Sequence, residues 1–169
     1  MKLLDGKLLA AQIRTEVKQE IQTRGLKPGL AAILVGDDPA SHLYVSLKEK
    51  ACQAVGINFH LYKFPASETA KNIAATIEFL NQDPDIHGMI IQLPLPPHLN
   101  EDELIAKMDP AKDADGFHPK NLELVDAGKP RIIPGLIAGI LKFLDSTGED
   151  LTNKTAVVVS NSPIFATPL

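Results

Sequence analysis

The sequence predicts an α/β fold: a three-layer α/β/α domain with a mostly parallel sheet. Two observations lead to this prediction. Short apolar runs typical of buried strands alternate with longer segments in which apolar residues recur every three or four positions, as on amphipathic helices. The first run, "LAAILVG" (30–36), is apolar throughout, which is typical of a parallel strand covered on both faces. Strands that alternate with helices favour parallel pairing through right-handed crossovers.

The predicted elements follow in the order helix, strand, helix, strand, helix, strand, helix. The first helix is indicated by an apolar stripe with a four-residue spacing: Leu9, Ile13, Val17 and Ile21. Strands are predicted over 30–36, 57–64 and 87–93. Helices are predicted between and after them, over 41–54, 67–80 and 100–108. Ser67 is the expected N-cap of the second of these helices, and Asn100 with Glu103 has the spacing of a capping box at the start of the third.

Beyond residue 108 the pattern is less regular. Residues 109–131 are predicted to form a long irregular segment, which in a compact domain is usually functional or a linker. A helix is predicted over 134–144, with Pro134 in its first turn. The apolar run "TAVVVS" (155–160) is predicted to begin a new strand.

Composition argues against several classes of protein. The 169 residues carry a net charge of −4, and their basic residues are scattered, so we expect no binding to nucleic acid or to an anionic membrane. The single cysteine, Cys52, excludes an internal disulfide and fits a reducing compartment. No apolar run approaches the roughly 20 residues of a membrane helix. These features predict a cytoplasmic protein.

A first group of polar residues lies on the predicted helix 41–54. Ser41, Tyr44 and Lys48 are spaced to share one face of that helix. The helix begins just past the carboxyl end of the first strand, where ligands bind in open α/β sheets. There a tyrosine ring could stack on a flat ligand, and a buried amine with a lowered pKa could act as a general acid or base. The alternative is an ordinary solvent-exposed face, which the spacing alone favours.

Gln92 closes the predicted strand 87–93 at the same end of the sheet. Its amide both donates and accepts, so it could position the Lys48 amine or an amide of a ligand. The prolines that follow cannot extend a strand ladder and would hold the chain in a stiff, extended path. The alternative is a strand-end amide beside an ordinary proline-rich turn.

The segment "PAKDADGFHPKN" (110–121) resembles a calcium loop only superficially. Asp113 and Asp115 have the expected spacing, but the sixth position, which requires glycine, is His118. The five histidines of the chain have no paired zinc-ligand spacing, so we expect no metal site. An aspartate in this segment could instead accept hydrogen bonds from an amino-substituted heterocycle, or it could serve only as a turn residue.

Three segments together resemble a known family. "VGDDPASHLYVSLKEKACQAVGI", "GMIIQLPLP" and "PAKDADGFHPKN" occur in the order and spacing of the bifunctional methylenetetrahydrofolate dehydrogenase / methenyltetrahydrofolate cyclohydrolase family. The resemblance covers residues 1–121 and extends weakly to the end. It implies a role in one-carbon folate metabolism: oxidation of 5,10-methylenetetrahydrofolate with NADP, then hydrolysis of the methenyl product to 10-formyltetrahydrofolate. It also implies tetrahydrofolate derivatives as ligands and is compatible with a homodimer.

The resemblance assigns roles to four expected catalytic residues. It implies that Lys48 handles protons in the cyclohydrolase step and that Gln92 tunes this lysine. It also implies that Tyr44 packs on the folate ring and that Asp115 holds the pterin ring. Besides these four, the expected substrate-binding residues are Ser41, Leu93 and Pro94.

The sequence departs from the family pattern near its end. The family's nucleotide loop contains two glycines and an arginine, whereas the expected cofactor-binding positions here are Ser160, Asn161 and Ser162. Ser160 and Ala166 stand where the family has the two glycines, and their Cβ atoms would crowd the pyrophosphate. We therefore expect a folate-binding catalytic domain over 1–121. Residues 122–169 would then supply a connecting helix and the first strand of an incomplete Rossmann-type domain that binds NADP weakly or not at all.

Two alternatives to a catalytic chain remain open at this point. One is a non-catalytic folate-binding remnant of the family. The other is an α/β module whose unfinished apolar strand pairs with another chain, because an exposed strand edge promotes dimerisation or aggregation.

Overall fold

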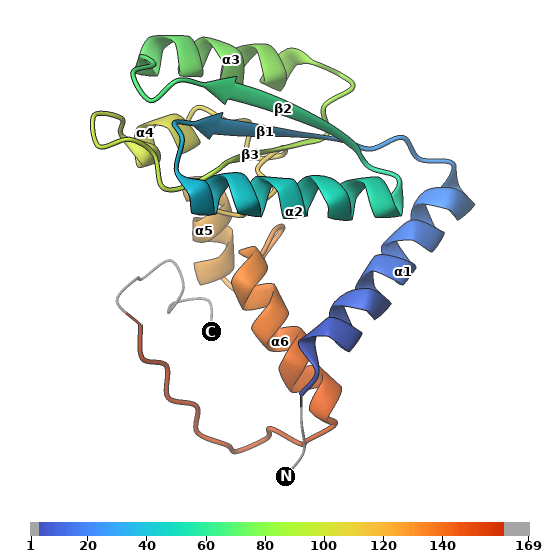
Figure 1. Ribbon diagram of the computed structural model, residues 1–169. Coiled ribbons are helices and arrows are strands. Elements are labelled where there is room, and N and C mark those ends of the chain that lie inside the picture. The colour runs from blue at the N-terminus through green and yellow to red at the C-terminus, as the bar shows by residue number, and fades with distance from the viewer. Residues whose placement is uncertain (1–3, 161–169) are drawn as a thin grey trace.

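The computed structural model describes residues 4–160 and confirms the α/β fold. Three parallel strands form one open sheet in the order β2-β1-β3. Their bounds are Gly29–Val35 for β1, Asn58–Phe64 for β2 and Gly88–Ile91 for β3. Helix α2 (Pro39–Val55) lies on one side of the sheet and α3 (Ala70–Gln82) on the other, which gives three layers (Figure 1).

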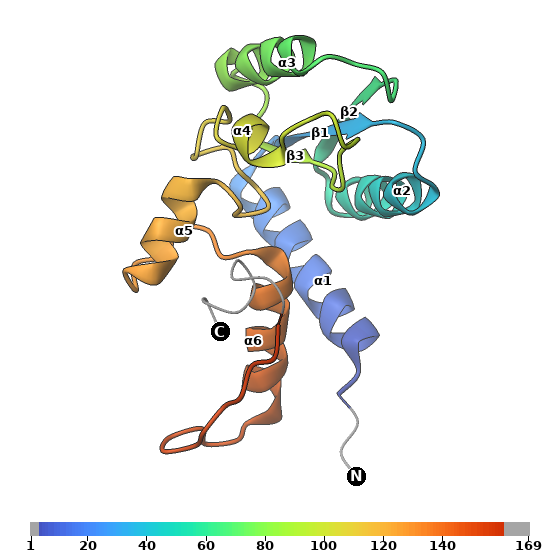
Figure 2. The same ribbon diagram turned by 90° about the vertical axis from the view of Figure 1, so that its left-hand side faces the viewer.

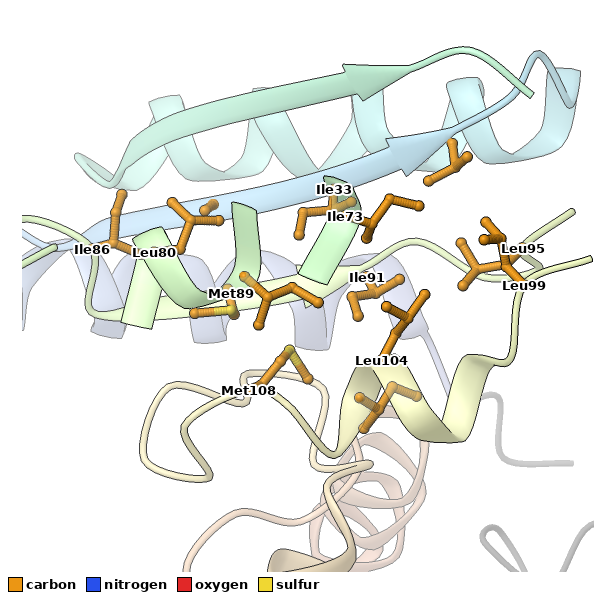
Figure 3. Packing of buried hydrophobic residues seen from close by; sticks show 14 residues of the cluster. Ile33, Ile73, Leu80, Ile86, Met89, Ile91, Leu95, Leu99, Leu104 and Met108 are labelled. Carbon is orange, nitrogen blue, oxygen red and sulfur yellow. The ribbon is translucent and has the colours of Figure 1, made fainter. Parts of the chain in front are cut away.

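A hydrophobic core cluster packs α3 against the sheet and extends to apolar residues between positions 95 and 108 (Figure 3). Its members from β1 and α3 are Ala31, Ile33, Val35, Ile73, Ile77 and Leu80. Successive side chains of a strand point to opposite faces, so Ala32 and Leu34, which are also buried, face the α2 side. There α2 buries Val45, Cys52 and Val55. Burial on both faces explains why the β1 sequence is apolar without alternation.

Helix α2 begins immediately after β1. The side chain of Asp38 caps it by accepting a hydrogen bond from the backbone N–H of Ser41, at 2.7 Å, and Pro39 occupies the first turn. The helix ends at Gly56, whose φ of 91° lies in the left-handed region that favours glycine. The cap and the short turn place the first two turns of α2 beside the carboxyl end of β1.

One expectation for the helices of the N-terminal half is wrong in detail. The N-cap of α3 is Thr69 and not Ser67, because the Thr69 hydroxyl accepts the backbone N–H of Asn72. Helix α1 (Gly6–Arg24) forms as predicted, but none of its residues is fully buried. It packs against α2, and Ile13 of its apolar stripe remains 36% exposed.

Between residues 85 and 160, three helices lie below the sheet or at its edge (Figure 2). They are α4 (Glu101–Ile105), α5 (Pro119–Asp126) and α6 (Gly135–Thr147). Asn100 caps α4 as predicted, but the helix ends before residue 108. The expectation of an irregular segment over 109–131 is wrong at its centre. There Nδ1 of His118 accepts the backbone N–H of Lys120 and caps α5.

The predicted strand over 155–160 is also wrong. These residues pair with no other strand in the described part of the chain, and Val157 and Val159 are 84% and 95% exposed. A β-prone sequence without a neighbouring strand has no ladder to join. Within residues 4–160, no helix combines the length and the apolar character needed to cross a bilayer.

Candidate functional site

Lys48 and Gln92 meet at the carboxyl ends of the strands. The Nζ atom of Lys48, on α2, donates a hydrogen bond of 3.0 Å to Oε1 of Gln92. Gln92 directly follows β3, and by strand alternation its side chain lies on the same face as Ile90, toward α2. Because β3 and β1 are parallel and α2 starts where β1 ends, both side chains come to the same edge of the sheet.

One backbone and two side-chain hydrogen bonds hold Gln92 in place. Its backbone N–H donates to the carbonyl of Ile33 at 2.9 Å, which continues the β1–β3 ladder by one residue. Its side-chain Nε2 donates to the carbonyl of Leu93 at 2.8 Å. Since the nitrogen of the amide is engaged there, the oxygen is directed at Lys48. Gln92 is 8% exposed, so this amide is shielded from water.

Asp115 reaches the same edge along a short segment beside β3. Met89 donates its backbone N–H to the carbonyl of Lys112, and Ala114 donates its own N–H to the carbonyl of Met89. This parallel bridge, which pairs Met89 with Asp113, adds a further extended segment to the sheet. Asp115 lies two residues beyond the bridge, at the end of β3 that also carries Gln92.

The carboxyl group of Asp115 is electrostatically coupled to Lys48. Burial raises the pKa of Asp115 above its ordinary value, and the negative charge of Asp113 adds to the rise. The positive charge of Lys48 acts in the opposite direction and lowers this pKa, although burial prevails. The structure therefore brings an amine, a carboxamide and a carboxyl group together at one edge of the sheet.

The other predicted site residues lie around this group with different exposure. Tyr44, one helical turn before Lys48, is 59% exposed, so its ring is open to solvent. Ser41 is buried at the start of α2. Leu93 is partly buried against the main cluster, whereas Pro94 is exposed. Of these residues, only Tyr44 presents a large surface on which a planar ligand could pack.

Sequence reasoning missed a group of buried polar residues next to Asp115. Asp113, His118 and Asn121 are at most 5% exposed. Asp113 accepts three hydrogen bonds, from the backbone N–H groups of Gly116 and His118 and from Nδ2 of Asn121. An aspartate followed three residues later by glycine is typical of a turn closed by a side chain, and that signal could have identified Asp113.

A separate hollow lies on the other side of the molecule. A cavity of about 690 Å³ between α3 and α4 is lined by Lys71, Glu78 and Lys107 among others, and by none of the predicted site residues. We place the candidate site at the converging polar groups, because they supply the chemistry. Within residues 4–160, no group of three or more histidine, cysteine, aspartate or glutamate side chains could hold a metal ion.

The predicted cofactor residues fall at the limit of the described chain. Ser160 is the last described residue, at the end of an extended segment. Asn161 and Ser162 lie outside the described residues, so the predicted nucleotide loop stays a prediction.

Several known proteins are similar to this chain in sequence and in fold. Residues 4–115 match the family model described as tetrahydrofolate dehydrogenase/cyclohydrolase, catalytic domain. The bifunctional protein FolD of Geotalea daltonii is 46% identical over 171 residues, which cover 99% of this chain and 61% of that protein. The crystal structure of the bifunctional FolD dehydrogenase/cyclohydrolase from Campylobacter jejuni superposes with a TM-score of 0.94 at 40% identity. The superposition covers 99% of this chain and 61% of the Campylobacter jejuni chain.

A Trypanosoma brucei methylenetetrahydrofolate dehydrogenase-cyclohydrolase, described as complexed with NADP cofactor and inhibitor, superposes with a TM-score of 0.83 at 30% identity. The superposition covers 87% of this chain and 52% of the Trypanosoma brucei chain. The chain therefore spans about 61% of the length of the curated relatives that it matches. The family match covers well over half of the chain and includes Lys48, Gln92 and Asp115, and we conclude that the chain belongs to the tetrahydrofolate dehydrogenase/cyclohydrolase family.

Proposed function

We propose that this chain supplies the folate-binding part of a methylenetetrahydrofolate dehydrogenase / methenyltetrahydrofolate cyclohydrolase, and that the Lys48 edge carries the cyclohydrolase step. The observation that carries the proposal is the 3.0 Å hydrogen bond from Lys48 Nζ to Gln92 Oε1, with the Asp115 carboxyl group in electrostatic reach of the same lysine. A positioned amine beside a fixed carboxamide is suited to moving a proton during attack by water.

In this reaction, water adds to the carbon that bridges N5 and N10 of 5,10-methenyltetrahydrofolate. The water loses one proton as the new C–O bond forms. The hydroxyl group of this adduct then loses the second proton to solvent as the bond from that carbon to N5 breaks, which leaves the formyl group on N10. In its neutral form, the Lys48 amine accepts the proton of the attacking water, and as an ammonium it returns a proton to the departing N5. Gln92 keeps the amine in place throughout by accepting one of its N–H groups.

Ligand binding is proposed to use the groups on either side of Lys48. The exposed ring of Tyr44 packs against the planar part of the folate. The Asp115 carboxylate accepts hydrogen bonds from the amino-substituted pterin ring. Ser41, Leu93 and Pro94 bound the same region.

A cyclohydrolase assay without nucleotide tests the proposal on the chain of 169 residues. We expect the chain to accelerate the loss of methenyl absorbance, and we expect K48A to abolish the acceleration. Lys50 lies on the same helix with an exposed side chain, so K50A is the matched control and should leave the rate unchanged. An unchanged rate in K48A would remove the role proposed for Lys48. Folate binding without hydrolysis in the unmodified chain would instead favour a non-catalytic folate-binding protein.

We propose that the oxidation step, hydride transfer from 5,10-methylenetetrahydrofolate to NADP, requires the full length of the relatives. In our proposal, residues 1–121 form the folate-binding catalytic domain, and residues 122–169 form the connecting helix and the beginning of the nucleotide-binding domain. The sequence around Ser160 supports weak NADP binding at most, since it lacks the glycines of the family loop. Titration of the purified chain with NADP tests this, and micromolar affinity would contradict it.

We also propose a cytoplasmic location and a homodimer. The exposed valines at 157 and 159 support self-association, because apolar backbone without a neighbouring strand can pair with a second copy. Light scattering on the purified chain should give the mass of a dimer, and a monomer mass at all concentrations would contradict this assembly.

A further inference from the structure

We propose that Asp113 is a positioning residue for Asp115. The buried Asp113 carboxylate holds the segment 113–118 in the conformation that presents the Asp115 carboxyl group to the edge occupied by Lys48. This inference rests on the proposed function in one respect, namely that Asp115 contacts the ligand.

The hydrogen bonds of Asp113 surround Asp115 in the sequence. Oδ1 of Asp113 accepts the backbone N–H of Gly116 at 3.0 Å, and Oδ2 accepts the backbone N–H of His118 at 2.8 Å. The peptide groups on the C-terminal side of Asp115 are therefore tied back to the residue two positions before it. Asp113 is 0% exposed, so no water competes for these bonds.

Asn121 ties the same carboxylate to α5 and to the start of the segment. Its Nδ2 donates to Oδ2 of Asp113 and to the carbonyl of Pro110, both at 2.9 Å. On the N-terminal side, Asp113 pairs with Met89 of β3 through the parallel bridge. Asp113 thus joins β3 through its backbone, and the Asp115 turn and the first turn of α5 through its carboxylate.

Two further observations show that this turn has little freedom to relax. Gly116 has a φ of 78°, and a Cβ atom built on it would lie 2.9 Å from the backbone nitrogen of Pro134. The turn is therefore packed directly against the segment that leads into α6. Among the charged groups, Lys48 from α2 and Asp113 from the same turn act on Asp115 with opposite effects on its pKa. Asp113 thus influences Asp115 through its charge as well as through geometry.

A double-mutant cycle tests the proposal. The Asp113 carboxylate accepts three N–H donors with its two oxygens. The D113N side chain has only one carboxamide oxygen, so at least one of these donors loses its acceptor. We expect D113N to weaken binding of 5,10-methenyltetrahydrofolate about tenfold, the loss typical of one buried charged hydrogen bond. In a D115A background we expect the same substitution to change affinity by less than about twofold, because residues that act through one another are not additive. An equal loss in both backgrounds would overturn the proposal.

N121A provides a second, milder variant in case D113N does not fold. It removes one donor to Asp113 and keeps the bonds from Gly116 and His118. We expect a smaller loss of affinity, about threefold, which should again disappear in the D115A background. A loss from N121A that persists in D115A would overturn the proposal equally well. Thermal unfolding of each variant separates these effects from a loss of folded protein.

A readout without ligand separates this proposal from the proposed function. If the unmodified chain binds no 5,10-methenyltetrahydrofolate, the proposed function fails, but the pKa of Asp115 can still be followed by NMR titration of its side-chain carboxyl carbon. We expect D113N to lower this pKa, because it removes a nearby negative charge. N121A keeps that charge, so a change of this pKa in N121A reports a change in the position of the Asp115 carboxyl group. An Asp115 pKa that is the same in the unmodified chain and in folded D113N would overturn the positioning role.

Discussion

Lys48 and Gln92 are separated by 44 positions in the chain, yet their side chains are joined by a 3.0 Å hydrogen bond. The bond depends on the parallel arrangement of β1 and β3, because only then do the start of α2 and the end of β3 lie at the same edge. In this protein the sheet topology is what creates the pair, and local sequence alone does not.

The Gln92 amide is expected to matter for turnover more than for folding. In Q92A, Lys48 loses its acceptor, and we expect hydrolysis of 5,10-methenyltetrahydrofolate to fall about 10- to 100-fold, the range for loss of one positioning hydrogen bond. Q53A alters an exposed glutamine on α2 and should leave the rate unchanged. Steady-state kinetics at saturating substrate measures the effect, and a Q92A rate within twofold of the unmodified chain would contradict it.

Asp115 should make the stability of the chain depend on pH. Its pKa in the folded state lies above the ordinary value of 3.8, so between the two values the folded state binds more protons than the unfolded state. The contribution of Asp115 to the free energy of unfolding is then fully present below about pH 3.8, and it is lost as the pH rises through the raised pKa. The D115N side chain cannot ionise. As the pH rises between these two pKa values, we therefore expect the unmodified chain to lose stability relative to D115N.

Urea unfolding of both proteins at a series of pH values measures this difference. A constant difference in the free energy of unfolding across the series would show that burial does not raise the pKa of Asp115.

Lys112 is expected to stabilise the end of α3. Its Nζ donates to the carbonyls of Leu80 and Asp83, at 2.8 and 2.7 Å, at the end of the helix, where the last carbonyls have no partner within the helix. The carbonyl of Asp83 also accepts the backbone N–H of Ile86, at 3.3 Å. We expect K112M to lower the free energy of unfolding by about 1–3 kcal/mol, since two partly buried carbonyls lose a charged donor. Lys107 is exposed and provides the control K107M, for which we expect almost no change. Equal losses in the two variants would contradict the capping role.

Thr69 and Ser67 give a direct test of where α3 begins. The Thr69 hydroxyl accepts the N–H of Asn72, so T69A should cost about 1 kcal/mol, the usual value of an N-cap. Ser67 makes no such bond, and S67A should be close to neutral. Chemical denaturation of the pair decides between the two caps, and the reverse order of stabilities would support Ser67.

The parts of the fold that the sequence predicts well are those whose pattern and environment agree. β1 is apolar throughout because both of its faces are covered, and α2 lies between an aspartate cap and a left-handed glycine. Residues 155–160 have an equally strong β pattern, but no strand lies beside them in the described chain. Their β propensity alone therefore does not produce a strand. A choice between two neighbouring caps, Ser67 and Thr69, depends on a single turn of backbone that residue type does not specify.

The candidate site was predictable to a similar extent. Lys48 and Gln92 could be assigned to one edge, because parallel strands bring their carboxyl ends together. The position of Asp115 depends on one isolated bridge between Met89 and Asp113, and a single pair of hydrogen bonds has no periodic signature. In the sequence, Asp113 has the spacing of a calcium ligand in a loop that lacks other residues that a calcium loop requires. In the structure its partners are N–H groups of its own turn and of α5.

The most direct measurement of the central claim is residue-resolved NMR of the chain during titration with tetrahydrofolate. We expect the largest shift changes at Tyr44, Lys48, Gln92 and Asp115. Changes centred instead on Lys71, Glu78 and Lys107, around the cavity between α3 and α4, would contradict the placement of the site.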